Sequence, residues 1–166
     1  KDTSGVMIIA KGDISHRNLS KQLKERKVKK KYLAIVEGKV PFDEKKVDIP
    51  MGRRGREPEK MAVTFRRPKS AITYLRVKER SPTATLLEVM PFTGRRHQIR
   101  LTLSFLGSPI IGDKKYGKSS ELISRQALHA YSISFSHPLT GKTLSFCAPL
   151  PEDFKNLLSK LSLNFR

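Results

Sequence analysis

The sequence predicts one α+β domain over residues 1–166, built on a mixed, mainly antiparallel sheet with flanking helices and basic loops. Three observations lead to this fold class. Short β-branched segments of strand length recur along the chain, and several of them are joined by tight turns. Other segments carry apolar residues at helical spacing. No internal repeat or low-complexity linker divides the chain.

The first half of the chain begins with alternating strand and helix patterns. The apolar run at residues 6–10 predicts a buried strand, and residues 15–27 predict a helix in which Leu19 and Leu23 lie four apart. Residues 32–37 predict the next strand. Residues 40–61 are basic and rich in proline and glycine, so we expect a loop or a loosely paired excursion there.

The second half of the chain predicts hairpins separated by short helices. Strand-like residues 71–80 and 84–90 are joined by a Ser-Pro-Thr turn. Proline and glycine then end the strand, and residues 96–106 have the apolar spacing of a helix. The remaining expected elements are a helical segment at 120–126, strands at 127–135 and 142–147, and a closing helix at 152–161.

The charge balance narrows the class of partner. Lys and Arg number 34 against 15 Asp and Glu, for a formal net charge of +19. Such an excess is best neutralised by a polyanion, either nucleic acid or an anionic membrane surface. The apolar run at residues 6–10 is far shorter than the ~20 residues that span a bilayer, and residues 1–5 do not resemble a signal peptide. Nucleic acid is therefore the predicted partner, and no membrane is expected.

The cysteine, the histidines and one glycine-containing segment bear on the cellular compartment and on cofactors. Cys147 is the only cysteine, which excludes an internal disulfide and favours a reducing, cytoplasmic location. The four histidines are far apart and have no cysteine partners, so no zinc site is expected. Residues 137–143 end like a nucleotide-binding P-loop, but Ser136 stands where the first glycine is required, so no nucleotide cofactor is expected.

The segment at residues 87–100 is the most informative part of the chain, because a strand ends in a glycine turn that opens a polar helix. Backbone amides at a helix N-terminus favour anions, and arginines add bidentate phosphate donors. His97 and Arg100 lie three apart, and Arg96 and Arg100 four apart, so we expect one shared face. The alternative is an ordinary solvated basic helix. The polar residues of this stretch are Arg95, Arg96, His97, Gln98 and Arg100.

Five stretches, in order, resemble motifs of the RluA family of pseudouridine synthases. The run Thr-Gly-Arg-Arg-His-Gln-Ile-Arg at 93–100, followed by 106–117, resembles the third conserved motif of that family. Residues 31–38 resemble its K-x-Y-x-A-x-V-x-G motif, and residues 1–5 resemble the tail of its H-R-L-D-x-x-T-S-G motif. Its C-terminal pattern is matched by residues 128–130, 137–141 and 148–151.

The resemblance also implies where the catalytic aspartate lies. In the family it is the D of H-R-L-D, three residues before the threonine that matches Thr3, which places it immediately before Lys1. Asp2 is a neighbour in the motif and is not assigned that role. The chain is therefore expected to be the C-terminal portion of a synthase domain, incomplete at its N-terminus and inactive by itself.

The resemblance implies an activity and a set of site residues. The reaction is isomerisation of uridine to pseudouridine in structured ribosomal or transfer RNA, by a monomer that needs no cofactor. Arg100 resembles the arginine that pairs with the catalytic aspartate, and Tyr32 the tyrosine that packs against the target base. The predicted RNA contacts are Arg95, Arg96, His97, Gln98, Lys30, Lys31, Arg53, Arg54 and Arg56.

Two other functions remain open from the residues alone. The first is a noncatalytic RNA-binding or assembly module derived from a synthase, and the second is a basic protein of ribosomal type, which has no need of the ordered Tyr32, His97 and Arg100 motifs. Several polar residues are given structural roles. His129 is expected in the core, His137 in a turn, and Asp113 in stabilising its glycine-bounded turn.

Overall fold

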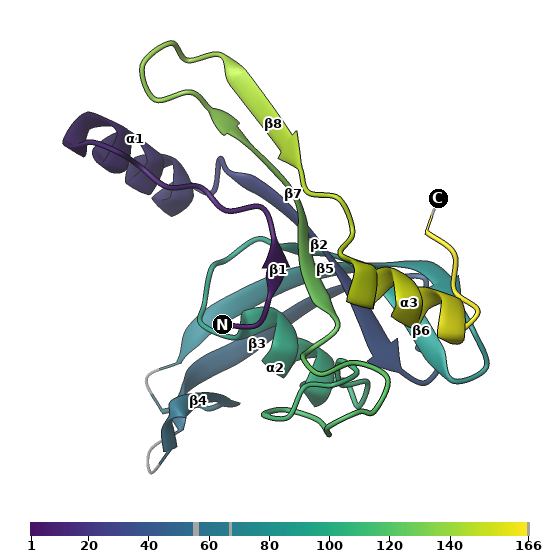
Figure 1. Cartoon of the computed structure of the whole chain (residues 1–166). Helices are drawn as coiled ribbons and strands as arrows, with labels where there is room; N and C mark the ends of the chain where they lie inside the picture. The colour runs from purple at the N-terminus through teal and green to yellow at the C-terminus, as the bar shows by residue number, and fades with distance from the viewer. Residues whose placement is uncertain (55–56, 67, 166) are drawn as a thin grey trace.

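The computed structural model describes residues 1–54, 57–66 and 68–165, with the side chains of residue 54 and residues 57–59 left out. One sheet organises this part of the chain, in the order β1-β7-β2-β6-β5-β3-β4, with β8 paired to β7 (Figure 1). The strands are β1 (Ser4–Gly5), β2 (Lys29–Glu37), β3 (Glu44–Arg54), β4 (Glu57–Val63), β5 (Lys69–Arg80), β6 (Ala84–Pro91), β7 (Leu128–Ser136) and β8 (Thr143–Cys147). The helices are α1 (Asp13–Lys24), α2 (Gln98–Phe105) and α3 (Glu152–Lys160). The predicted α+β class is confirmed.

Every strand pairing is antiparallel except that of β1 with β7. Strand β2 lies in the interior of the sheet, where it pairs with β6 from Tyr32 to Glu37 and with β7 on its other edge. The β5–β6 and β7–β8 hairpins predicted from their turns are confirmed. Strand β1 has two residues, and its pairing brings the start of the chain beside β7, with Ser4 opposite His129.

The main core joins the sheet to α2 and α3. Ile35 of β2, Leu86 of β6, Leu103 of α2 and Phe154 of α3 are each at most 1% exposed and belong to one apolar cluster. Burying side chains of this size contributes roughly 1.5–3 kcal/mol each. The cluster therefore fixes α2, and with it the polar residues around the start of that helix.

A second, smaller apolar cluster lies outside the main core. Leu19 of α1 packs there with Val28 and Phe135, beside Ile8 and other partly buried side chains. Gln22 holds the helix to the hairpin, because its amide donates to the Ser136 carbonyl (2.7 Å) and accepts from the Ser136 N–H (2.9 Å). Figure 1 shows α1 and the far end of the β7–β8 hairpin extending together away from the sheet; we call this unit the arm.

Two predicted elements have a different conformation. Residues 6–10 form no strand, and Met7 and Ile9 are 77% and 74% exposed. Only alternate side chains of the run, Ile8 and Ala10, pack against the small cluster around Leu19. Residues 120–126 form bends without a helix. There Ser120 Oγ accepts the Leu122 N–H at 3.2 Å, a local bond that competes with helical hydrogen bonding.

The expected loop at residues 40–61 is largely a pair of strands. Its second part is β3 and the start of β4, and β3 pairs with β5 over eight residues from Glu44 to Met51. Pro50 fits because its carbonyl accepts the Thr64 N–H at 2.9 Å. Gly52 leaves room for Thr64, since a Cβ at position 52 would lie 2.5 Å from the Thr64 methyl group unless that side chain moved.

The first helix is shifted from its predicted bounds. It ends at Lys24, before the predicted end at residue 27, and Arg26 lies in the left-handed region with φ 60°. Of the two leucines that lie four apart, Leu19 is buried, whereas Leu23 is 51% exposed, and the helix buries Gln22 beside Leu19. The closing helix predicted at 152–161 is confirmed as α3.

Candidate active site

A cavity of about 820 Å³ opens between the first residues of the chain, β2 and the start of α2. Segments that are far apart in the sequence line it, including residues 1–3, residues 91–100 and residues 124–128. Tyr32 and Arg100 both line this cavity, and Arg100 is not directed into bulk solvent, since its side chain is 13% exposed. The two residues that the family resemblance singles out therefore share one site.

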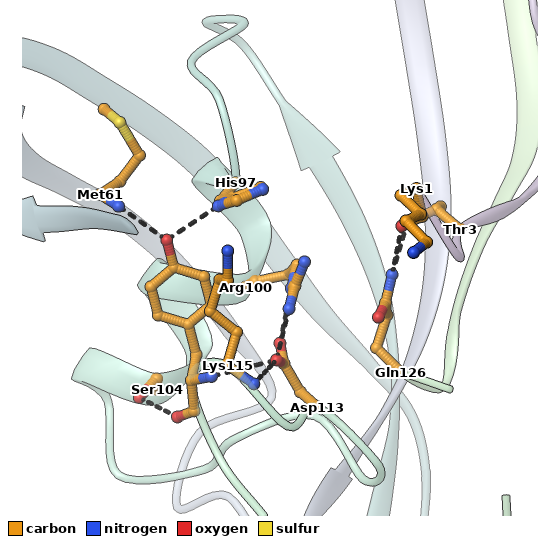
Figure 2. Close-up of polar contacts among 10 residues, drawn as sticks. Lys1, Thr3, Met61, His97, Arg100, Ser104, Asp113, Lys115 and Gln126 are labelled. Carbon is orange, nitrogen blue, oxygen red and sulfur yellow. Dashed lines mark hydrogen bonds and ion pairs between the residues drawn. The ribbon is translucent and has the colours of Figure 1, made fainter. Parts of the chain in front are cut away.

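Arg100 forms a bidentate ion pair with Asp113 (Figure 2). Its Nε lies 2.7 Å from Oδ2 and its Nη2 lies 2.6 Å from Oδ1. Asp113 is fully buried and also accepts the backbone N–H groups of Lys115 and Tyr116, each at 3.0 Å. Fork-to-fork pairs of this kind fix the arginine in one orientation.

The electrostatics of Asp113 keep it charged. Burial would raise the pKa of this carboxyl, but the hydrogen bonds and charge of Arg100, with the two backbone amides, outweigh burial and hold the pKa below its usual value. The sequence predicted a partner for Arg100 ahead of Lys1 and a turn role for Asp113. In the structure Asp113 has the turn role and is also the arginine's partner, while Nη1 of Arg100 has no hydrogen bond to a described residue.

Helix α2 begins at Gln98, two residues later than predicted. His97 caps it in the left-handed region, with φ 55°, so Arg96 and His97 precede the helix and do not share a helical face with Arg100. The physical reason is Gln98, whose carbonyl oxygen accepts the Arg95 N–H (2.9 Å) and the Thr93 hydroxyl (2.8 Å) and so closes the turn before the helix.

Gln98 is buried, at 3% exposure, and its amide is committed within the protein. Its Nε2 donates to the Ile72 carbonyl (2.9 Å) and to the Thr73 hydroxyl (3.0 Å), which ties the turn to β5. Gln98 also lines the cavity, so the structure gives it a role in holding the turn and its RNA contact stays a prediction. Arg95, Arg96 and His97 all line the cavity.

His97 belongs to a hydrogen-bonded chain that crosses to β4. Its Nδ1 lies 2.9 Å from the Tyr116 hydroxyl, which accepts the Met61 N–H at 2.8 Å (Figure 2). Burial, followed by the charges of Arg100, Arg96 and Lys115, lowers the pKa of His97 to about 4. The imidazole is therefore neutral at physiological pH.

Strand β2 directs alternate side chains to different surroundings. Lys30 and Tyr32 line the cavity, and burial lowers the pKa of Lys30 and raises that of Tyr32. Lys31 lies between them, is exposed, and pairs with Glu88 at 3.2 Å. The structure thus brings Lys30 to the site and does not bring Lys31 there.

The predicted basic loop is not part of the cavity lining. Arg53 is exposed on β3 and does not line the cavity. The side chain of Arg54 and all of Arg56 lie outside the described residues. Their RNA contacts remain a prediction.

The start of the chain is held at the cavity by two residues that sequence reasoning missed. Gln126 Nε2 donates to the Lys1 carbonyl (2.9 Å) and to the Thr3 hydroxyl (3.2 Å). Arg125 Nη1 donates to the Asp2 carbonyl at 3.5 Å, while Nε and Nη2 pair with Asp153 of α3 at 2.7 Å and 2.8 Å. Tyr116 was also missed, although it lies in the Gly112–Gly117 turn that the motif comparison included. Its signal was an aromatic residue in a glycine-bounded turn beside the arginine motif.

The structural roles predicted for two other residues, His129 and His137, are confirmed. His129 is 1% exposed and is hydrogen-bonded to the Ser4 hydroxyl and the Ala148 carbonyl. His137 Nδ1 accepts turn N–H groups from Leu139 and Thr140.

Across the residues that the structure describes, no group of three potential metal ligands occurs, and no helix is long and apolar enough to cross a membrane.

Comparison with known proteins identifies the family. A family model described as RNA pseudouridylate synthase matches residues 1–105. The chain therefore belongs to the RNA pseudouridine synthase family. Several of its relatives are named ribosomal large subunit pseudouridine synthase C or D, which confirms the resemblance to the RluA family.

Relatives of known sequence match nearly the whole chain. The RNA pseudouridine synthase YlyB of Bacillus subtilis is 42% identical over 165 residues, covering 99% of this chain and 54% of that protein. Ribosomal large subunit pseudouridine synthase D of Neisseria meningitidis is 41% identical over 175 residues, covering 98% of this chain and 46% of the relative. The chain thus spans about half the length of the curated relatives it matches.

Solved structures share the fold. Human RNA pseudouridylate synthase domain containing 1 superposes with a TM-score of 0.79 at 29% identity, covering 90% of this chain and 66% of that chain. Human RNA pseudouridylate synthase domain containing 4 gives a TM-score of 0.72 at 26% identity, covering 90% and 68%.

Proposed function

We propose that the protein containing this chain converts uridine to pseudouridine in structured ribosomal or transfer RNA. The observation that carries the proposal is the meeting of Arg100, Tyr32 and the first residues of the chain around one basic cavity. The synthase names of the relatives favour an enzyme over a noncatalytic RNA-binding module. We further propose that it acts as a monomer in the cytoplasm, without a cofactor.

The reaction breaks the bond between N1 of the uracil and C1′ of the ribose, turns the freed base, and joins C5 to C1′. The proton lost from C5 is balanced by one gained at N1, so no co-reactant is consumed. A carboxylate beside C1′ serves as nucleophile or base, as in glycoside cleavage. The family resemblance assigns this carboxylate to the residue immediately ahead of Lys1, beside the cavity.

In this proposal Arg100 keeps the nucleophilic carboxylate ionised. An ionised carboxylate next to a base requires a charged partner. Because Asp113 engages Nε and Nη2 of Arg100, the free Nη1 is available to a second acid at the cavity. Asp113 then acts through Arg100 as a positioning residue.

The other cavity residues bind the target nucleotide. The half-buried ring of Tyr32 stacks on the extruded uracil, a contact that contributes ~1–3 kcal/mol. Extruding the base from its stack costs a few kcal/mol. Lys30, Arg95 and Arg96 offset that cost by pairing with phosphates.

The proposal is tested by mapping pseudouridine in ribosomal and transfer RNA from cells that lack the gene. At least one position should revert to uridine, and the wild-type gene should restore it. The Arg100→Lys variant keeps the charge but loses the bidentate geometry, and it should restore little or no product while its RNA affinity stays within about threefold of wild type. An unchanged pseudouridine map in the deletion strain would overturn the proposed activity.

A further inference from the structure

Tyr116 links three separate parts of the site. Its hydroxyl accepts the Met61 N–H from β4 at 2.8 Å and lies 2.9 Å from His97 Nδ1. Its backbone carbonyl accepts the Ser104 hydroxyl of α2 at 2.7 Å, and its ring lies 5.2 Å from the Arg100 guanidinium carbon. The mechanism proposed above uses none of the contacts of this hydroxyl.

The direction of each hydrogen bond follows from the number of protons available. The backbone N–H of Met61 can only donate, so the Tyr116 oxygen is the acceptor in that bond. The hydroxyl proton then has a single acceptor among the described residues, which is Nδ1 of His97. If Nδ1 carried the proton instead, the Tyr116 O–H would have no partner in this half-buried position.

A neutral imidazole carries one proton, so Nδ1 as acceptor requires that Nε2 carry it. The imidazole stays neutral because it is partly buried beside three cations. Nε2 has no hydrogen bond to a described residue, and Figure 2 shows this end of the ring turned away from Tyr116. His97 lines the cavity, so its free N–H is available to a bound molecule.

We propose that Tyr116 is a positioning residue that fixes His97 as the Nε2–H tautomer, and that this N–H donates to a carbonyl oxygen of the extruded uracil. The inference deepens the proposed function and rests on it. His97 becomes a specificity-determining residue, because its donor recognises the base itself.

A uracil carbonyl suits this donor better than a phosphate does. The cavity already presents Lys30, Arg95 and Arg96 to anions, whereas His97 offers one neutral donor. Tyr32, whose ring is proposed to stack on the base, lines the same cavity. Carbonyl oxygens O2 and O4 are the hydrogen-bond acceptors that uracil exposes when its ring faces are stacked.

The tautomer can be measured without RNA or activity. Long-range 1H–15N correlation spectra of the full-length protein at pH 6–8 should show His97 with a protonated Nε2 and an unprotonated Nδ1. The His97→Asn variant assigns the signals, since asparagine tolerates the left-handed backbone at this position. In Tyr116→Phe the two nitrogens should move toward averaged shifts, whereas Tyr131→Phe, which removes a hydroxyl without a partner among the described residues, should leave them unchanged. A protonated Nδ1 in the wild type would overturn the tautomer assignment.

The contact with the base is tested by kinetics on RNA carrying 4-thiouridine or 2-thiouridine at the mapped target, since sulfur is a weak acceptor. One of the two substitutions should lower kcat/KM of the wild type about fivefold or more and leave that of His97→Asn within about twofold. Equal losses in both proteins for both substitutions would show that His97 contacts a phosphate or nothing, and would overturn the base contact. Because the spectra need no turnover, a failed tautomer assignment and a failed synthase function give different results.

Discussion

At the scale of single residues, the ion pair between Arg100 and Asp113 is the most consequential contact of the site. Asp113 is fully buried and Arg100 nearly so, which removes both charges from water. Their attraction offsets that cost only because two short hydrogen bonds and two backbone amides complete the geometry. Loss of either partner therefore leaves a buried charge uncompensated.

Asp113→Asn should lower the free energy of unfolding by about 3 kcal/mol, because it leaves the Arg100 guanidinium without its counter-charge. Urea denaturation followed by circular dichroism measures the change. Glu44→Gln is the matched control, since Glu44 pairs with Arg76 at 2.7 Å but both side chains are more than half exposed. That variant should change stability by less than about 1 kcal/mol. Equal losses in the two variants would contradict the importance of burial.

The pH dependence of stability should report His97. Its pKa is about 4 in the folded protein and 6.5 in the unfolded chain, so between these values only the unfolded state binds the proton. The effect of His97 on the free energy of unfolding is therefore at its most favourable above pH 6.5. As the pH falls toward 4, the free energy of unfolding decreases by on the order of 1–2 kcal/mol after screening. Thermal unfolding of wild type and His97→Asn at pH 4–8 measures it.

The comparison of the two proteins isolates His97. Burial also lowers the pKa of His129, and this shift makes the free energy of unfolding fall with decreasing pH equally in both proteins. Asp113, whose pKa is held below 3.8, loses its contribution only at still lower pH. The two stability curves should therefore converge as the pH falls from 6.5 to 4, and parallel curves would contradict the shifted pKa.

The sequence identified the site residues that match motifs of a known family, and it failed where a role depends on contacts across the fold. Tyr32 and Arg100 could be chosen from motifs, and both reach the cavity. Gln98 and Tyr116 could not be interpreted, because their roles come from partners on β5 and β4. A hydrogen bond between residues 26 or 55 positions apart leaves no local pattern in the sequence.

At the scale of elements, the prediction of a loop at 40–61 failed for a definite reason. Proline and glycine usually interrupt strands, and this segment contains several. Here the Pro50 carbonyl still accepts the Thr64 N–H, and Gly52 leaves space for the Thr64 methyl group. The periodic segments, by contrast, were predictable, because alternation in β5 and the helical spacing in α3 match their observed burial.

The β3–β4 hairpin carries the test of RNA binding outside the cavity. Changing Arg53, Arg54 and Arg56 together to Gln should weaken RNA binding and make the slope of log K against log salt shallower by about 2, provided that all three contact phosphate. Filter-binding titrations at several salt concentrations measure the slope. The control triple, Lys78, Lys155 and Lys160 changed to Gln, removes the same charge from exposed positions and should leave the slope nearly unchanged. Identical slopes for the two triples would mean that the hairpin arginines contribute only net charge.

At the scale of the whole molecule, the two apolar clusters divide the structure into a sheet body and the arm. The main cluster joins the sheet to α2 and α3, so the cavity walls rest on it. The arm cluster contains few buried residues, and its polar attachments are Gln22, which bonds to the Ser136 backbone, and Asn18, whose Nδ2 donates to the Pro138 carbonyl at 3.1 Å. Small clusters with few buried contacts open at lower free energy than a main core. The arm should therefore be able to open while the cavity stays intact.

Gln22→Ala should loosen the attachment of α1 to the hairpin without unfolding the sheet, while the Asn18 bond to the Pro138 carbonyl remains. It removes both hydrogen bonds to the Ser136 backbone, at 2.7 Å and 2.9 Å, and leaves these groups unsatisfied, which should lower the local opening free energy by about 1–3 kcal/mol. Hydrogen exchange followed by mass spectrometry should show faster exchange in α1 and at the far end of β7, and unchanged exchange in β2. Lys21→Ala, at the neighbouring exposed helix position, should alter neither. Faster exchange throughout β2 as well would contradict independent opening of the arm. It would mean that the arm and the sheet open as one cooperative unit, in which a single local contact limits the stability of both apolar clusters.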